Sequence, residues 1–162
     1  MCGIAGGNLF TIDSIKESLD DTKHRGYDAQ QVFEELLLYM FIEYGVEVFQ
    51  ILDGMFSFAI YDRQEQKIWM GRDWVGRLPF YYFHRKGKLA FSSERKGLTK
   101  SLNVRNKHIK VVLPAHYYCF DINNKLLDKV RYYSVPNRII EEPKDVIVKN
   151  IREKIELAVE NE

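Results

Sequence analysis

A cysteine stands directly behind the initiating methionine, in the opening stretch MCGIAGG. If Met1 is removed, Cys2 carries both a thiol and a free α-amino group, whose ordinary pKa values are about 8.5 and about 7.7–8.0. Such an amine can act as general base for the thiol of its own residue, and the thiolate can then attack an amide to form a thioester. A single early cysteine is more often a small buried residue, so both interpretations stay open on this stretch alone.

Two helices are predicted after the first apolar segment, which covers residues 2–10. The first begins with Ser14 as its N-cap, has Glu17 at the capping-box spacing and ends near Gly26. The second has Asp28 as its N-cap and ends at Gly45. Its apolar residues recur at helical spacing, namely Val32, Phe33, Leu36, Leu37, Met40, Phe41 and Tyr44.

From residue 54 the apolar pattern changes to a period of two, which predicts strands. Residues 55–62, MFSFAIYD, place Phe56, Phe58 and Ile60 on one face, and neither face is strongly polar. Further strands are predicted at IWMGR, FYYFH and LAFSS, joined by polar turns. The stretch 109–122 is predicted as a strand with an edge position or a bend at Pro114. Pro143 begins a last helix, with Ile147, Ile151, Ile155 and Ala158 on one face.

Composition limits the class of protein. The 162 residues include 24 Lys and Arg against 23 Asp and Glu, 46% apolar residues and 29% charged residues, typical of a soluble globular domain. Two cysteines make no disulfide framework, and no leader or long apolar run is visible, so we expect a cytoplasmic protein without membrane contact. The basic stretch 95–110 lacks interleaved aromatic residues and is predicted to be a solvated loop rather than a nucleic-acid surface.

Six motifs occur in one order along nearly the whole chain: MCGIAG, HRGYD, LDGMFSFAIYD, GRDWVGRLPFYY, LAFSSERKGL and VLPAHYYCFD. Together they resemble the class II glutamine amidotransferase domain, most closely the N-terminal half of glutamine-hydrolysing asparagine synthetases. The resemblance implies an α+β fold, the αββα sandwich of the N-terminal nucleophile hydrolases. It also implies Cys2 as the nucleophile that hydrolyses glutamine to glutamate and ammonia, with ATP and magnesium used only by a separate synthetase domain.

The same resemblance identifies segments that this sequence lacks. An Arg-Leu-Ser-Ile and an Asn-Gly-Glu segment, expected to hold glutamine, are absent, and the domain is shortened near residues 28–33. We therefore expect an incomplete sandwich in which Phe56, Phe58 and Ile60 are short of partners. Asp28 is a candidate substitute for the carboxylate that binds the substrate amine.

The predicted domain division follows from this pattern. Residues 1–142 form the amidotransferase-like domain, and residues 143–162 form the first helix of a truncated linker to a synthetase domain. No Ser-Gly-Gly-x-Asp-Ser loop is present, so no ATP or other cofactor is expected for this chain.

Other candidate residues receive structural interpretations. Arg72 and Asp73 are expected to hold a loop. His24 and Arg25 favour a helix C-terminus. A further set is assigned no chemistry: Ser93 and Glu94 are expected to be a hydrogen-bonding pair, Cys119 a core residue, and His84, His108 and His116 lack metal-ligand spacing.

Three interpretations of function stay open. The chain is a glutaminase domain acting through Cys2, with its pocket completed by a synthetase partner chain or by another copy. Alternatively, it is a non-catalytic remnant that binds a partner at most. The third interpretation is an incomplete gene model, whose true coding sequence includes the missing pocket and the synthetase domain.

Overall fold

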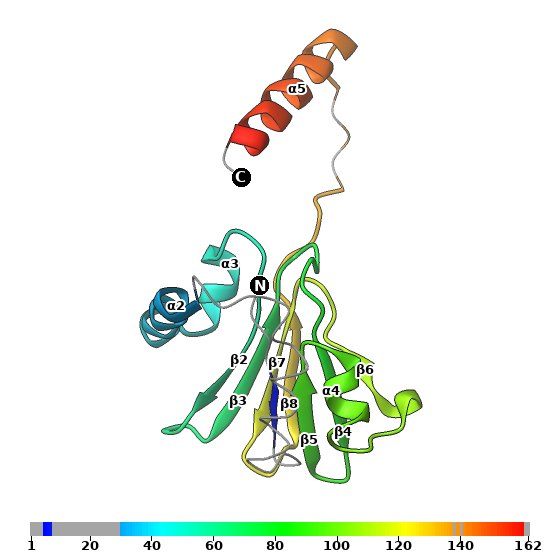
Figure 1. Cartoon of the computed structure of the whole chain (residues 1–162). Coiled ribbons are helices and arrows are strands. Elements are labelled where there is room, and N and C mark those ends of the chain that lie inside the picture. The colour runs from blue at the N-terminus through cyan, green and yellow to red at the C-terminus, as the bar shows by residue number, and fades with distance from the viewer. Residues whose placement is uncertain (1–4, 8–29, 138, 140, 161–162) are drawn as a thin grey trace.

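Two antiparallel sheets of four strands form the centre of the computed structural model, which describes residues 5–7, 30–137, 139 and 141–160 (Figure 1). The first sheet has the order β1 (Ala5–Gly7), β5 (Lys88–Ser92), β4 (Tyr81–Arg85), β6 (Lys110–Val111). The second sheet has the order β2 (Ser57–Asp62), β3 (Lys67–Arg72), β7 (His116–Asp121), β8 (Leu126–Arg131). Three sequence-adjacent pairs, β2–β3, β4–β5 and β7–β8, are neighbours within a sheet.

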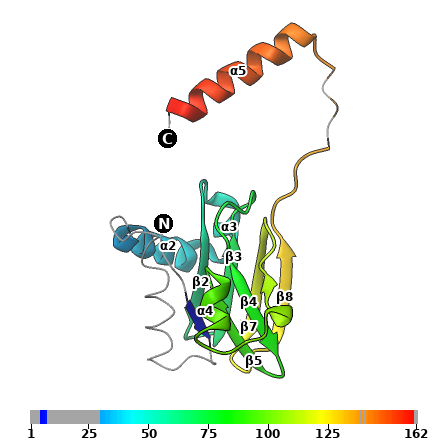
Figure 2. The same cartoon turned by 45° about the vertical axis from the view of Figure 1, so that its right-hand side comes forward.

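Helices lie on the outer face of both sheets. The helices α2 (Gln30–Tyr44) and α3 (Val48–Ile51), joined by the 3-10 turn η2 (Gly45–Glu47), pack on the second sheet. On the first sheet lies the short helix α4 (Arg95–Thr99), followed by the 3-10 turn η3 (Asn106–His108). Figure 2 shows this layering from a second direction. The described residues thus have the predicted αββα order of layers.

Three apolar clusters fill the spaces between these layers. The largest lies between the sheets and includes Met70 of β3, Tyr82 of β4 and Phe120 of β7. Neighbouring residues on the same strands point outward: Trp69 contacts the α2 and α3 layer, while Tyr81 contacts the α4 layer. Most of each sheet is therefore covered on both faces, which explains why a strand such as β3 lacks a polar face.

The expectation that Phe56, Phe58 and Ile60 are short of partners was wrong. All three side chains are buried, in one cluster with Leu37 of α2 and Phe49 of α3. The Phe49 ring stacks on Phe58 at 5.2 Å between centroids. These helices cover the strand face whatever other segments are missing, so the expected shortage of partners does not arise.

A close approach of helix to sheet occurs at Gly71 of β3. A Cβ atom added at Gly71 would overlap the ring of Phe49. Glycine is therefore required for α3 to sit this close to the second sheet.

The prediction of one strand over 109–122 was wrong, and the alternative of a bend at Pro114 is confirmed. Residues 110–111 form β6 in the first sheet, whereas residues 116–121 form β7 in the second. Pro114 lacks the amide hydrogen that a continuing strand needs, and Ala115 has a positive φ of 58°. The chain crosses from one sheet to the other at this bend.

At the end of the sandwich that carries the β4–β5 and β7–β8 turns, hydrogen bonds join the two sheets. The side-chain amide of Asn124, in the β7–β8 turn, donates to the Gly87 carbonyl at 3.0 Å. The Asn124 carbonyl in turn accepts a hydrogen bond from His84 Nε2 at 2.6 Å. Asn124 is buried and joins a turn of the second sheet to a hairpin of the first.

The helix α5 (Lys144–Glu160) confirms the helix predicted after Pro143, but it contributes no buried residue. Its predicted face, which includes Ile151 and Ile155, is exposed. Figures 1 and 2 both show α5 beyond one end of the sandwich, connected through residues 132–143. The proposed division at residue 143 stays a prediction. No helix among the described residues is long and apolar enough to cross a membrane.

Candidate functional site

The residues predicted for catalysis and substrate binding, Cys2 and Asp28, lie outside the described residues, as do His24 and Arg25. The nearest described element to Cys2 is β1. Its first residue, Ala5, follows Cys2 by three positions and pairs with Ser92 at the end of β5. Ser92 also pairs with Tyr81 at the start of β4. The N-terminal strand therefore begins at the end of the sandwich where the 73–79 loop enters the first sheet, and we call this the loop end.

The side chain of Arg72 holds the backbone of the loop end by donating hydrogen bonds to three carbonyl groups. Its Nε donates to the Leu78 carbonyl at 2.6 Å, and its two terminal nitrogens donate to Val112 and Gly76 carbonyls at 3.0 and 2.5 Å. Burial lowers the pKa of Arg72, an effect that the nearby Asp73 partly opposes. The planar guanidinium thus joins the 73–79 loop to the segment that leaves β6.

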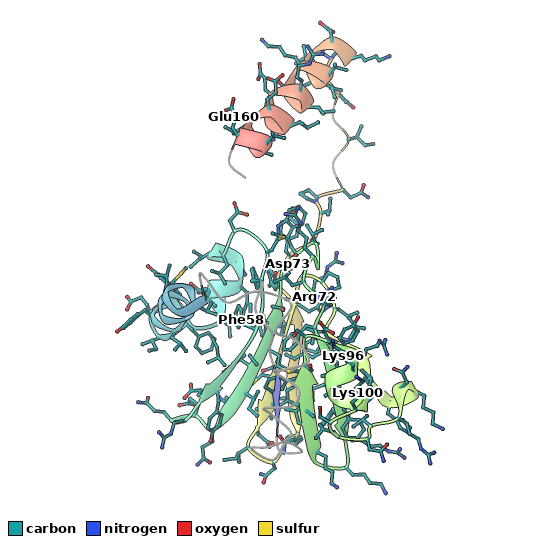
Figure 3. All side chains as sticks on the ribbon, in the orientation of Figure 1. Phe58, Arg72, Asp73, Lys96, Lys100 and Glu160 are labelled. Atoms are coloured by element: carbon teal, nitrogen blue, oxygen red, sulfur yellow. The ribbon has the colours of Figure 1, made fainter. Side chains whose placement is uncertain are left out.

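Asp73 completes this arrangement from the acceptor side. The carboxylate is buried and accepts hydrogen bonds from the backbone amides of Gly76 at 2.7 Å and Arg77 at 3.1 Å. The Asp73 amide donates to Phe56 O at 2.9 Å, and its carbonyl accepts from the Ala115 amide at 3.0 Å. Figure 3 shows Arg72 and Asp73 together at this end. These hydrogen bonds of the Arg72 and Asp73 side chains all go to backbone groups, which supports the structural interpretation of this pair.

Tyr132 is a residue that the sequence interpretation missed. Its hydroxyl donates to the Arg72 carbonyl at 2.8 Å, and its amide donates to Ala115 O at 2.9 Å. Burial, followed by the charge of Asp73, raises the pKa of Tyr132. The preceding strand, β8, is exposed along its whole length and its sequence shows no alternation of apolar and polar residues. The sequence therefore gave no indication that the tyrosine after this strand is held by hydrogen bonds.

Ser93 and Glu94 extend β5 at the loop end. Ser93 is buried, and the Glu94 carboxylate forms a partly exposed ion pair with Lys96 at 3.2 Å. The Glu94 amide donates to the Ser92 hydroxyl at 3.2 Å. These contacts fix the turn from β5 into α4, while the specific pairing predicted between Ser93 and Glu94 stays a prediction.

Cys119 is a core residue, as predicted. It is buried in β7, and burial raises the pKa of its thiol to about 11, a shift that the nearby Lys67 partly opposes. A thiol with this pKa is almost entirely protonated near neutral pH and is a poor nucleophile. Within the described ranges, no group of three His, Cys, Asp or Glu side chains is arranged to hold a metal ion.

A family model described as a glutamine amidotransferase domain matches residues 34–146 of this chain. The matched range runs from α2 through both sheets into the start of α5. It therefore contains the complete loop end apart from the N-terminal strand.

Curated relatives agree with this match. The human glutamine-hydrolysing asparagine synthetase is 34% identical over 120 residues, which cover 68% of this chain and 21% of the relative. Asparagine synthetase 1 of Arabidopsis thaliana is 28% identical, covering 80% of this chain and 20% of the relative. Asparagine synthetase 3 of Bacillus subtilis is 24% identical, covering 96% and 29%. The chain spans less than a third of the length of these three relatives.

The antiparallel sheets between helical layers, the order of motifs and the family match all point the same way. The chain belongs to the glutamine amidotransferase domain family, in the type found in asparagine synthetases.

Proposed function

We propose that this chain hydrolyses glutamine to glutamate and ammonia through Cys2. After removal of Met1, the α-amino group accepts the thiol proton, and the thiolate attacks the side-chain amide carbon of glutamine. The carbon–nitrogen bond breaks, the nitrogen takes up a proton and leaves as ammonia, and a thioester remains. Water then attacks the thioester, which releases glutamate and returns the thiol.

The observation that carries this proposal is the family match together with the register of β1. Cys2 precedes Ala5 by three positions in the sequence, and three residues of extended chain span at most about 11 Å. Ala5 is paired to Ser92 at the loop end, where Arg72 and Asp73 fix the neighbouring backbone. A nucleophile needs a rigid surround of this kind to hold the reacting atoms in alignment.

Asp28 is proposed as the group that binds the α-amino group of glutamine. In the sequence it stands two positions before the first residue of α2, and a carboxylate forms a strong charge-assisted bond to an ammonium group. Asp28→Asn should raise the KM for glutamine while leaving kcat within a few-fold of its original value. An unchanged KM would exclude this role for Asp28.

The reaction as written uses no cofactor. Its product is a small neutral nucleophile, and we propose a synthetase chain that uses ATP and magnesium as the partner that consumes it. Cytoplasmic localisation belongs to the same proposal. We infer both the synthetase partner and the localisation from the relatives, which are named asparagine synthetases.

The experiment that tests the proposal compares the two cysteines. Intact mass first establishes whether Met1 is removed, because a retained methionine excludes the mechanism. Ammonia release from glutamine is then measured for the unaltered chain, Cys2→Ala and Cys119→Ala. We expect activity to disappear in Cys2→Ala and to persist in Cys119→Ala, whose buried thiol lies outside the mechanism. Equal ammonia release from the unaltered chain and Cys2→Ala would overturn the proposal.

A second candidate is a non-catalytic binding protein. The observation that favours it is the outward side of α2, where Leu38, Tyr39 and Ile42 are all exposed. Apolar side chains grouped on one helix face commonly mark a contact surface. If the chain shows no glutaminase activity and Ile42→Asp abolishes its association with a synthetase chain, this second function is the correct one.

A further inference from the structure

Positive charge is concentrated in one part of this chain. Residues 85–110 contain nine Lys and Arg residues and one acidic residue, whereas the whole chain has 24 Lys and Arg against 23 Asp and Glu. This range runs from the end of β4 through β5, α4 and η3 to the start of β6. Residues 30–54, which include α2 and α3, contain five acidic residues and no Lys or Arg. The two helical layers of the sandwich therefore carry opposite charge.

Five exposed cationic side chains form the centre of the positive layer. We call them the basic face: Arg85, Lys88, Arg95, Arg105 and Lys107. Arg85 and Lys88 stand directly opposite each other in the β4–β5 pair, so their side chains leave the sheet on the same side. Tyr81, four positions before Arg85 on β4, packs against the α4 layer. The period of two along a strand therefore places Arg85 and Lys88 on the α4 side of the first sheet.

The η3 turn joins this surface through His108. The Arg85 guanidinium donates to His108 Nε2 at 3.3 Å. Burial, followed by the charges of Arg85, Lys107 and Arg105, lowers the pKa of His108. Cations of β4 and of the η3 segment are thus close enough to act on the same imidazole.

The helix α4 contributes Arg95, whose position is fixed by two contacts. Its guanidinium lies over the Tyr81 ring, 4.8 Å from the ring centroid, and donates to Asn106 Oδ1 at 3.1 Å. Asn106 begins η3, so Arg95 lies beside the segment that carries Arg105. Figure 3 labels Lys96 and Lys100 on the same helix. Segments separated in the sequence therefore bring their cations together on one side of the sandwich.

This arrangement is unfavourable for the isolated chain. Like charges directly opposite each other in two strands, as in Arg85 and Lys88, lower the stability of a hairpin. A local conflict that folding alone does not require is typical of a surface used for binding.

We propose that the basic face binds an acidic segment of another protein. Glutamate or aspartate carboxylates of that partner accept hydrogen bonds from Arg85, Arg95 and Arg105, whose planar guanidinium groups match a carboxylate with two parallel bonds. Bound carboxylates also relieve the repulsion within the face. Because the contacts Arg95 makes with Tyr81 and Asn106 hold its guanidinium in place, little side-chain freedom is lost there on binding.

Two other polyanions fit this surface less well. Single-stranded nucleic acid is held largely by bases stacked on exposed aromatic rings, whereas the Tyr81 ring is already covered by Arg95. Membrane-surface helices insert large apolar side chains below the headgroups, and within residues 85–110 no large apolar side chain is exposed. Charge without stacking or insertion is what an acidic polypeptide requires.

The test measures binding of a fluorescein-labelled oligoglutamate peptide by fluorescence anisotropy at low salt. Arg85→Gln/Arg105→Gln should raise its Kd about tenfold, because two exposed ion pairs are lost. The matched control is Lys144→Gln/Lys149→Gln, which makes the same change in net charge at exposed positions of α5. The control should stay within about twofold of the unaltered chain. Equal Kd values for the two double variants overturn the proposal, because binding then follows net charge alone.

A second measurement uses the unaltered chain and needs no variant that could fail to fold. The pKa of His108, followed by NMR, should rise when oligoglutamate binds, because carboxylates offset the cations around the imidazole. An unchanged His108 pKa at saturation places the peptide elsewhere and overturns the proposal.

The identity of the polyanion is tested in parallel. Oligothymidylate with the same number of charges, and vesicles containing phosphatidylserine, should both bind more weakly than oligoglutamate. Tighter binding of either one overturns the proposal in favour of a nucleic acid or a membrane. Cys2→Ala should bind oligoglutamate like the unaltered chain, so this result is independent of glutamine hydrolysis.

Discussion

The helices α2 and α5 both carry apolar residues at helical spacing, yet their surroundings differ completely. On α2, Leu37 is buried against Phe49 and Phe58, and Met40 and Phe41 are packed around it. On α5, no residue is buried. Helical periodicity in a sequence therefore predicts a face that prefers burial, but the partner of that face depends on what the rest of the chain brings near it.

The largest effect should come from the buried side of α2. Leu37 is 7% exposed, and Leu37→Ala should lower the free energy of unfolding by about 2–5 kcal/mol because it leaves a cavity. Ile42, on the outward side, is 78% exposed, and Ile42→Ala should cost less than about 0.5 kcal/mol. Urea denaturation measures both, and similar costs would contradict the difference described between the two sides of α2.

Gly71→Ala should destabilise by about 1–3 kcal/mol, because the added methyl group overlaps the Phe49 ring and forces α3 away from the sheet. The same measurement in a Phe49→Leu background gives a control for this explanation. If the ring is the cause, the further cost of Gly71→Ala should shrink there. An undiminished cost would place the strain elsewhere.

Tyr132→Phe removes only the hydroxyl that donates to Arg72 O, so it should cost about 0.5–1.5 kcal/mol. Tyr61→Phe, at an exposed position on β2, serves as the matched control and should change stability little. Thermal unfolding of the two variants compares the loss of Tm at Tyr132, whose hydroxyl is hydrogen-bonded, with the loss at an exposed strand position. A Tm for Tyr132→Phe equal to that of Tyr61→Phe would show that the bond contributes nothing measurable.

The last expected effect is a dependence of stability on pH. Burial, followed by the neighbouring Tyr118, raises the pKa of Tyr82 to about 12. A tyrosine whose pKa is raised on folding contributes stability that is complete below its unfolded pKa near 10 and is lost as the pH rises towards 12. Stability should therefore fall less steeply between pH 10 and 12 in Tyr82→Phe than in the unaltered chain. Parallel pH profiles would contradict the assignment to Tyr82.

Much of the sandwich was predictable from the sequence because its signals are local. Strand alternation and polar turns located β2–β5, and Gly45 marked the end of α2, as predicted. The resemblance to a known family supplied the αββα layering. These features depend on residues that are neighbours in the chain or on a pattern of motifs that spans it.

Other elements were missed for identifiable physical reasons. The helix α4 has only five residues, with a glycine among them, so it lacks a readable period, and its basic stretch was interpreted as a loop. The strand β8 is exposed throughout and shows no alternation. The hydrogen bonds of Arg72 and Asp73 go to backbone groups, which any sequence supplies, so their partners could not be read in advance.

The order of strands in the two sheets has a consequence for how the protein folds. Three hairpins join residues close in the chain and can form early, whereas β1 pairs Ala5 with the distant Ser92. Contacts between distant residues carry the larger loop-closure cost and are made late. We therefore expect the N-terminal strand to be the last to join its sheet, so that the segment carrying Cys2 reaches its place only in a molecule that is otherwise folded.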